Sequence, residues 1–101
     1  MGKRERREVA ARLETLAFHL IQWRYQPELQ CGLWRNSIHE ARHRIEDLRR
    51  DNPSLRPYLG EYLPQAYGYG RARTLDETAS LGLPESCPWT IEQILAPDRL
   101  P

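Results

Sequence analysis

The sequence predicts a small all-α domain, and three observations support this fold class. Apolar residues recur every three or four positions in two long stretches, which is the spacing of one face of an α-helix. No stretch shows the alternation of apolar and polar residues that is typical of a β-strand. The chain has 101 residues, which is enough for one domain with one hydrophobic core. We therefore predict a single small helical bundle over residues 1–101: an antiparallel helical hairpin, a kinked third helix and a short C-terminal helix.

The first helix is predicted over about residues 4–25. Alternating spacings of four and three residues place one apolar face on Val9, Leu13, Leu16, Leu20 and Trp23. Phe18, Ile21 and Tyr25 add a second apolar strip beside this face. A helix that is apolar over so wide an arc needs more than one neighbour to cover it. Pro27 disfavours helical geometry at Gln26 and has no N–H group, so the helix should end there.

The second helix is predicted over about residues 33–51. The same spacing recurs in Trp34, Ile38, Ala41, Ile45 and Leu48. Residues 26–32 form a link with Gly32 at its exit, and so short a link makes the two helices antiparallel neighbours. Trp23 and Trp34 should then lie near the same end of the hairpin.

The third helix is predicted over about residues 54–79, with a break near residues 64–70. Pro64 falls inside this pattern, and proline removes a backbone donor from a helix interior. The glycines at positions 60, 68 and 70 each cost about 1 kcal/mol relative to alanine in a helix. We therefore expect a kink or a break in this helix.

A short fourth helix is predicted over residues 91–95. Thr90 and Gln93 stand three residues apart before an apolar pair, which matches the capping box found at helix starts. Pro97 should end this helix.

Composition and charge limit the functional classes. The formal net charge is +1, which argues against a protein dedicated to binding polyanions. Basic residues are in excess in residues 1–56, and acidic residues are in excess in residues 57–101, so the two halves can attract each other within one molecule or between copies. No signal peptide or membrane span is evident, and Cys31 and Cys87 are expected to be free thiols in a cytoplasmic protein.

The sharpest motif is the HExxH string of His39, Glu40 and His43 on the second helix. In zinc hydrolases this spacing puts two imidazoles on one helical face, where they bind the metal, and the glutamate activates the bound water. The extended zincin form needs glycine and then histidine at positions 46 and 49, where this chain has Glu46 and Arg49, although Glu61 stands at a distance that a gluzincin could use for a third ligand. The simpler interpretation is a polar flank of the helix, so we expect no cofactor and keep zinc hydrolysis as the third hypothesis.

Arginines are dense on the second helix, and a basic helix can lie along phosphates. The nucleic-acid candidates are Arg35, Arg42, Arg44 and Arg49. Glu40 precedes Arg44 by four residues, and Glu46 follows Arg42 at the same spacing, so local ion pairs are expected to neutralise part of this charge. Nucleic-acid binding is therefore the alternative hypothesis.

Five blocks, in this order along the chain, carry a resemblance to a known family. They are residues 17–27 (AFHLIQWRYQP), 34–38 (WRNSI), 52–59 (NPSLRPYL), 66–67 (AY) and 87–95 (CPWTIEQIL). The sequence is similar to the bacterial family catalogued as domain of unknown function 29. The resemblance implies an all-α fold, a cytoplasmic origin and no assigned activity. It also implies that this chain lacks a helical segment with which family members usually begin.

The leading functional hypothesis is a non-catalytic helical interaction module. If the additional N-terminal segment is missing, the apolar arc of the first helix lacks a partner, and a second copy or another protein could cover it. The expected interaction residues are Leu13, Leu16, Leu20, Trp23 and Trp34. We expect a homo-oligomer or a protein partner, and no membrane contact.

Overall fold

The computed structural model describes residues 3–78, 82–97 and 99–100, and within these ranges it contains helices and no strand. The order of elements is α1 (Lys3–Tyr25), the short 3-10 turn η1 (Pro27–Leu29), α2 (Gly32–Asp51), α3 (Leu55–Glu77) and α4 (Ile91–Leu95). The prediction of an all-α bundle with a helical hairpin, a third helix and a short last helix is confirmed.

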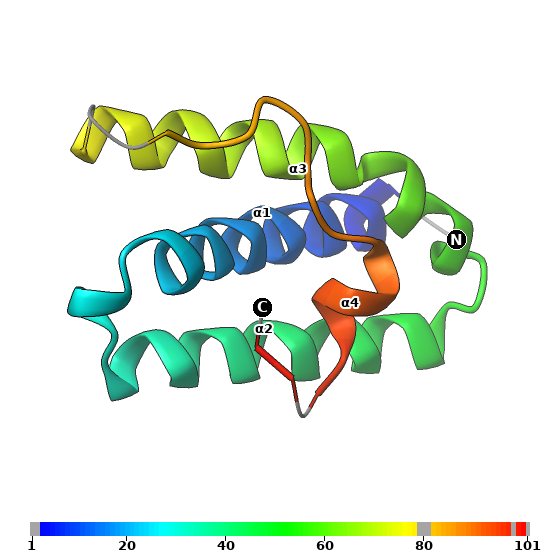
Figure 1. Ribbon diagram of the computed structural model, residues 1–101. Coiled ribbons are helices and arrows are strands. Elements are labelled where there is room, and N and C mark those ends of the chain that lie inside the picture. Colours follow the sequence, from blue (N-terminus) through cyan, green and yellow to red (C-terminus); the bar gives the residue numbers. More distant parts are fainter. Residues whose placement is uncertain (1–2, 79–81, 98, 101) are drawn as a thin grey trace.

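The first helix, α1, is the central element of the bundle. It runs between α2 and α3 and packs along both, whereas α2 and α3 make few contacts with each other (Figure 1). The short α4 contacts both α1 and α3 and lies across the side of the bundle that α2 and α3 leave open. The wide apolar arc of α1 therefore finds its several neighbours within one chain.

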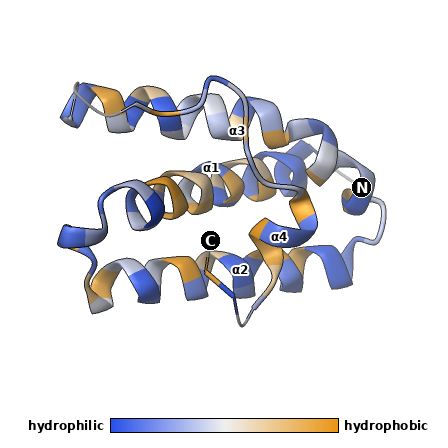
Figure 2. Cartoon of the chain, viewed as in Figure 1, coloured by the Kyte–Doolittle hydropathy of each residue, from blue (hydrophilic) through white to orange (hydrophobic). Residues whose placement is uncertain are grey.

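The core is built around the apolar residues of α1, and Figure 2 colours several turns of this central helix as hydrophobic. Leu13, Leu16 and Leu20 have no exposed surface, and Ile45 of α2 and Leu55 of α3 are equally buried around them. Ile94 of α4 is also completely buried in this cluster. Burying a leucine or isoleucine side chain contributes roughly 1.5–3 kcal/mol, so this cluster dominates the stability of the bundle.

The helix ends follow the local sequence signals. The first helix, α1, ends at Tyr25, and Pro27 opens η1 after Gln26, as expected. The capping box of α4 is confirmed, because the backbone N–H of Gln93 donates to Thr90 Oγ1 at 3.2 Å. In return, the Thr90 amide donates to Gln93 Oε1 at 2.8 Å.

The third helix, α3, differs from its prediction. It continues without interruption through Pro64 to Glu77, so the break expected near residues 64–70 was wrong. Its predicted end at residue 79 lies outside the described residues. The reason is tertiary packing, since Leu59, Leu63 and other residues of its inner face are buried against α1. Such packing supplies most helical stability in proteins and outweighs poor local propensity.

The segment after α3 is tied to the outside of that helix. Pro84 O accepts hydrogen bonds from Tyr67 Oη at 2.6 Å and from Arg71 Nε at 3.0 Å. Trp89 lies edge-on against the Tyr67 ring, with the centroids 6.3 Å apart. These contacts guide the chain from α3 across the bundle to α4.

Candidate functional site

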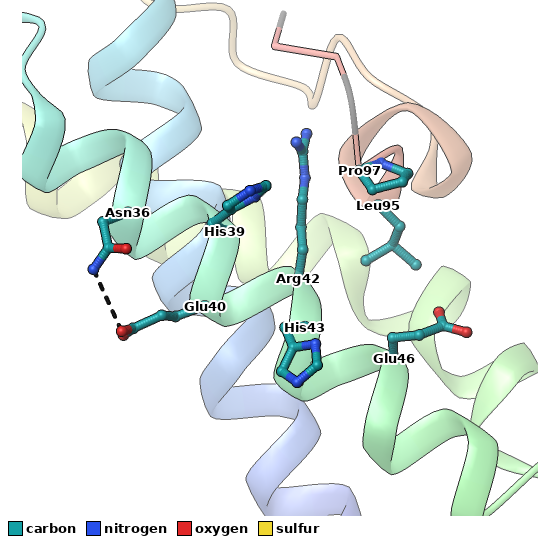
Figure 3. A pocket seen from close by; sticks show the side chains of 8 residues that line it. All are labelled: Asn36, His39, Glu40, Arg42, His43, Glu46, Leu95 and Pro97. Carbon is teal, nitrogen blue, oxygen red and sulfur yellow. Dashed lines mark hydrogen bonds between the residues drawn. The ribbon is translucent and has the colours of Figure 1, made fainter.

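The clearest hollow beside the HExxH string is an open pocket between α2 and the end of α4, with a volume of about 450 Å³. Side chains from one face of α2 form its floor, and Leu95 and Pro97 form its far wall (Figure 3). The lining residues from α2 are Asn36, His39, Glu40, Arg42, His43 and Glu46. The predicted motif therefore lines a real cavity, which exists only because α4 packs beside it.

The two histidines of this pocket lie on exposed positions of α2 and do not point toward each other (Figure 3). His43 Nε2 is 3.5 Å from Asp47 Oδ2, but the His43 side chain is 80% exposed, so this contact is weak. Glu40 Oε1 accepts a hydrogen bond from Asn36 Nδ2 at 3.4 Å. Each member of the HExxH string thus lies where the sequence predicts, without forming a joint site.

A metal site needs further ligands close to these imidazoles. Within residues 3–78, 82–97 and 99–100, no group of three or more His, Cys, Asp or Glu side chains is arranged to hold a metal ion. Zinc in catalytic sites takes three protein ligands, and the helix offers two imidazoles here. The geometry gives the zinc hypothesis no support beyond the motif itself.

Arg42 has a structural position that the sequence did not indicate. Its side chain is only 6% exposed, and its Nε donates to Ile94 O at 2.7 Å in the last turn of α4. The carbonyls at a helix C-terminus lack partners within their helix and interact favourably with a cation. Arg42 therefore fastens α4 to α2, and it is not exposed to phosphate as the nucleic-acid hypothesis required.

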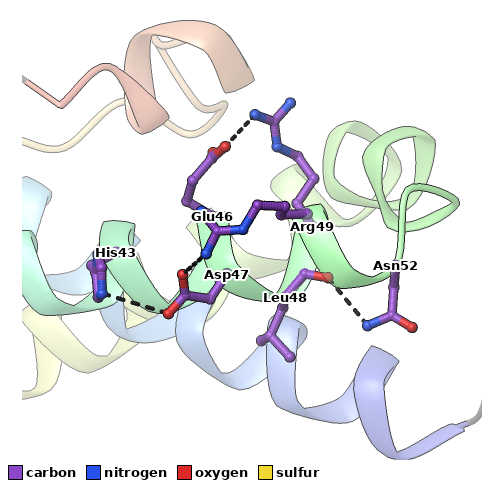
Figure 4. Close-up of polar contacts among 7 residues, drawn as sticks. His43, Glu46, Asp47, Leu48, Arg49 and Asn52 are labelled. Atoms are coloured by element: carbon purple, nitrogen blue, oxygen red, sulfur yellow. Dashed lines mark hydrogen bonds and ion pairs between the residues drawn. The ribbon is translucent and has the colours of Figure 1, made fainter.

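The other candidate arginines also make contacts within the chain. Arg44 Nη2 lies 2.6 Å from Glu8 Oε2 and links α2 to α1. Arg49 Nη2 lies 2.6 Å from Glu46 Oε1, one of the contacts drawn in Figure 4. Neither of the expected local pairs, Glu40/Arg44 and Arg42/Glu46, is among the ion pairs between the residues that the structure describes. Arg44 pairs with Glu8 on α1 instead, and Arg42 Nε donates to the Ile94 carbonyl on α4. Arg35 lies over the Trp23 ring, with Cζ 5.3 Å from its centroid.

A comparison with known protein families identifies the family of this chain. The family model described as Domain of unknown function DUF29 matches residues 1–100. The chain belongs to this family. No curated protein and no solved structure matches the chain. Because the family description names no activity, the function of this DUF29 chain has to be argued from its own surface.

The interaction residues predicted for the DUF29 chain fall into two groups. Leu13, Leu16 and Leu20 are completely buried inside one chain, so they offer no surface to a second copy. The physical reason is that α2, α3 and α4 together cover the apolar arc of α1. Trp23 and Trp34 are only partly buried, at the end of the hairpin where α1 meets α2.

Two further apolar residues of this DUF29 chain lie at the same end, and the sequence analysis missed them. Leu33 in the first turn of α2 is 78% exposed, and Leu29 in η1 is 54% exposed. Both residues are apolar but lie outside the periodic apolar faces of the two long helices. An apolar residue away from such a face is a candidate for an exposed position, and this could have identified them. We call the surface of Trp23, Leu29, Leu33 and Trp34 the hairpin tip.

The cysteines of the DUF29 chain show no sign of a reactive site. Burial raises the pKa of the Cys87 thiol, which keeps it protonated and unreactive, and its Sγ lies 3.4 Å from Trp89 O. Cys31 is an exposed free thiol beside the hairpin tip. None of the described helices is both long and apolar enough to span a membrane.

Proposed function

We propose that this chain is a non-catalytic interaction module, located in the cytoplasm of a bacterium, that self-associates through the hairpin tip. The observation that supports the proposal is the exposure of Leu33 and Leu29 at the same end of the hairpin as two half-buried tryptophans. Contiguous exposed apolar patches are uncommon on monomeric proteins and mark interaction sites. Of the described large apolar residues, the most exposed are Leu29, Leu33 and Tyr69, and two of these three belong to the tip.

The tip is held in a defined shape before any partner arrives. Gln30 Nε2 donates to Trp23 O at 2.8 Å, which ties the link back to α1. The Arg35 guanidinium lies over the Trp23 ring, and it restricts the orientation of this indole. A preorganised surface loses less conformational entropy on binding, so more of the burial energy contributes to affinity.

A second copy of the chain is the occupant that the charges at the tip fit best. The exposed rim carries both signs, with Glu28 in η1 and Arg24 and Arg35 on the two helices. A twofold contact is self-complementary, because each residue meets a residue of the same patch on the other copy. Glu28 of one copy can then face an arginine of the other around a centre formed by Leu29 and Leu33.

Sedimentation equilibrium over a range of concentrations tests the proposal. We expect a monomer–dimer equilibrium that the double change Leu29→Ser/Leu33→Ser weakens at least tenfold, since each buried leucine contributes about 1–2 kcal/mol at an interface centre. Tyr69→Ser is the matched control, because it removes another exposed apolar side chain on α3. A chain that stays monomeric at high micromolar concentration, or a dimer that Tyr69→Ser weakens equally, would overturn the proposal.

A further inference from the structure

The start of α1 has an unusual distribution of charge. Lys3, Arg4, Arg6 and Arg7 are all exposed, and Glu5 is the one acid among residues 3–7. The N-terminus of a helix carries a partial positive charge, so acidic side chains stabilise it and basic ones destabilise it. Four cations at this position therefore do not serve the stability of α1.

A second helix starts at the same end of the bundle. α1 and α3 run in the same direction, with their N-termini at one end (Figure 1). Arg56 in the first turn of α3 is exposed and adds a further positive charge there. No ion pair within the described residues involves Lys3, Arg4, Arg7 or Arg56, in contrast to Arg44 and Arg49 of α2.

Aromatic rings lie beside these cations. Tyr58 and Tyr62 on α3 are partly exposed and stacked, with centroids 5.7 Å apart and ring planes inclined by 22°. Arg6 Cζ lies 5.4 Å from the centroid of Tyr58. Tyr62 Oη donates to Glu14 Oε2 at 2.5 Å, which fixes the tyrosine pair against α1. The cations thus have an ordered aromatic neighbour.

From this arrangement we propose that the end of the bundle formed by Lys3, Arg4, Arg6, Arg7, Arg56 and Tyr58 binds single-stranded nucleic acid. The cations contact the phosphates, and an unstacked base packs against the Tyr58 ring or the adjacent Arg6 guanidinium. Proteins that bind single strands combine a positive surface with aromatic rings for base stacking. A duplex has no unpaired base that could stack on Tyr58. An acidic protein would bind the cations but would not use the aromatic ring. A single strand therefore matches this site best. This site is separate from the hairpin tip and does not depend on self-association.

Fluorescence anisotropy with a labelled single-stranded oligonucleotide, in RNA and DNA forms, tests the proposal. The double change Arg4→Glu/Arg7→Glu should lower the affinity at low salt at least tenfold. It should also reduce the slope of log K against log salt by about 1.4, because each phosphate contact on a single strand contributes about 0.7. The same variant should not lower the thermal unfolding temperature, since acidic residues suit a helix N-terminus. A loss of binding without a loss of stability separates function from misfolding.

The matched control is Arg73→Glu/Arg99→Glu, which changes the net charge equally at exposed positions outside this end of the bundle and outside the hairpin tip. At about 0.1 M salt it should leave the affinity within about twofold, because charges farther away than the Debye length of about 10 Å are then screened. Tyr58→Leu should weaken binding to the single strand several-fold and leave the salt slope unchanged. Three results would each overturn the proposal: no binding at low salt, equal losses in both double variants, or tighter binding to a duplex or to polyglutamate than to the single strand.

Discussion

Gly70 of α3 lies directly against the backbone of Phe18 in α1. A Cβ atom at position 70 would come 2.9 Å from the Phe18 amide nitrogen and 3.0 Å from its Cα. The absence of a side chain at Gly70 is therefore what lets α1 and α3 approach each other. Gly68 lies two residues earlier in the same helix, and a Cβ there would meet nothing within 4 Å.

Alanine substitutions at these two glycines should have opposite effects on stability. Gly70→Ala should destabilise the protein by about 1–3 kcal/mol, because the new methyl group overpacks the helix contact against backbone atoms that cannot turn away. Gly68→Ala should stabilise it by about 0.5–1 kcal/mol, because alanine loses less conformational entropy in a helix. Urea unfolding of the two variants measures both changes. Equal effects at the two positions would show that Gly70 is not a close contact.

Removing the Arg42 side chain should release α4. Arg42→Ala should cost about 1.5–3 kcal/mol, which is typical of a buried hydrogen bond from a charged group. In this variant, backbone amide hydrogen exchange should become faster mainly in Ile91–Leu95, because Arg42 Nε donates to the Ile94 carbonyl in the wild type. Arg50→Ala is the control, since Arg50 is mostly exposed and its pair with Asp47 should contribute under 1 kcal/mol. Uniform exchange along the chain in Arg42→Ala would contradict this role.

The Tyr62–Glu14 contact predicts a loss of stability at alkaline pH. The hydrogen bond to Glu14, together with burial, raises the pKa of Tyr62 to about 12 from its ordinary value of 10. Its contribution to stability is therefore complete below pH 10 and is lost as the pH rises through 12. Tyr62→Phe should cost about 1 kcal/mol at neutral pH, and the difference from the wild type should shrink between pH 10 and 12. Urea unfolding at several pH values measures it, and a constant difference would refute the coupling.

The ion pair between Glu8 and Arg44 should matter little at physiological salt. Both side chains are partly exposed, so Glu8→Gln should destabilise the protein by under 1 kcal/mol. The effect should decrease further as salt is added, because screening weakens exposed pairs. Thermal unfolding of the wild type and the variant at low and high salt measures this. A large effect that persists at high salt would mean that the pair is more deeply desolvated than its exposure indicates.

Helix periodicity predicted most of the fold. The apolar spacing on α1 and α2 is long and regular. Pro27 marks the end of α1 and the Thr90–Gln93 capping box marks the start of α4, both by local chemistry. The sequence could not predict the continuity of α3, because a glycine that loosens a helix and a glycine that admits a neighbouring backbone look the same. Gly70 belongs to the second kind, and only the position of Phe18 reveals it.

The candidate sites were less predictable than the fold. The HExxH string lies on the expected helix face, but its pocket depends on α4, whose position is set by contacts over long sequence separations such as Arg42 with Ile94. The arginines of α2 were expected to pair locally, whereas Arg44 pairs with Glu8 across two helices. The exposed Leu29 and Leu33 carry no periodic signal at all. For the HExxH pocket and for Arg44, the deciding partner comes from another element.

The central position of α1 has a consequence for synthesis in the cell. Chains fold as they leave the ribosome, beginning with the N-terminal elements. Here α1 emerges before the three helices that cover its leucines, and Ile94 joins them only after α2 and α3 have been made. Leu13, Leu16 and Leu20 therefore remain open to chaperones until α2 and α3 have been made, and this is the stage at which the nascent chain is most prone to aggregate.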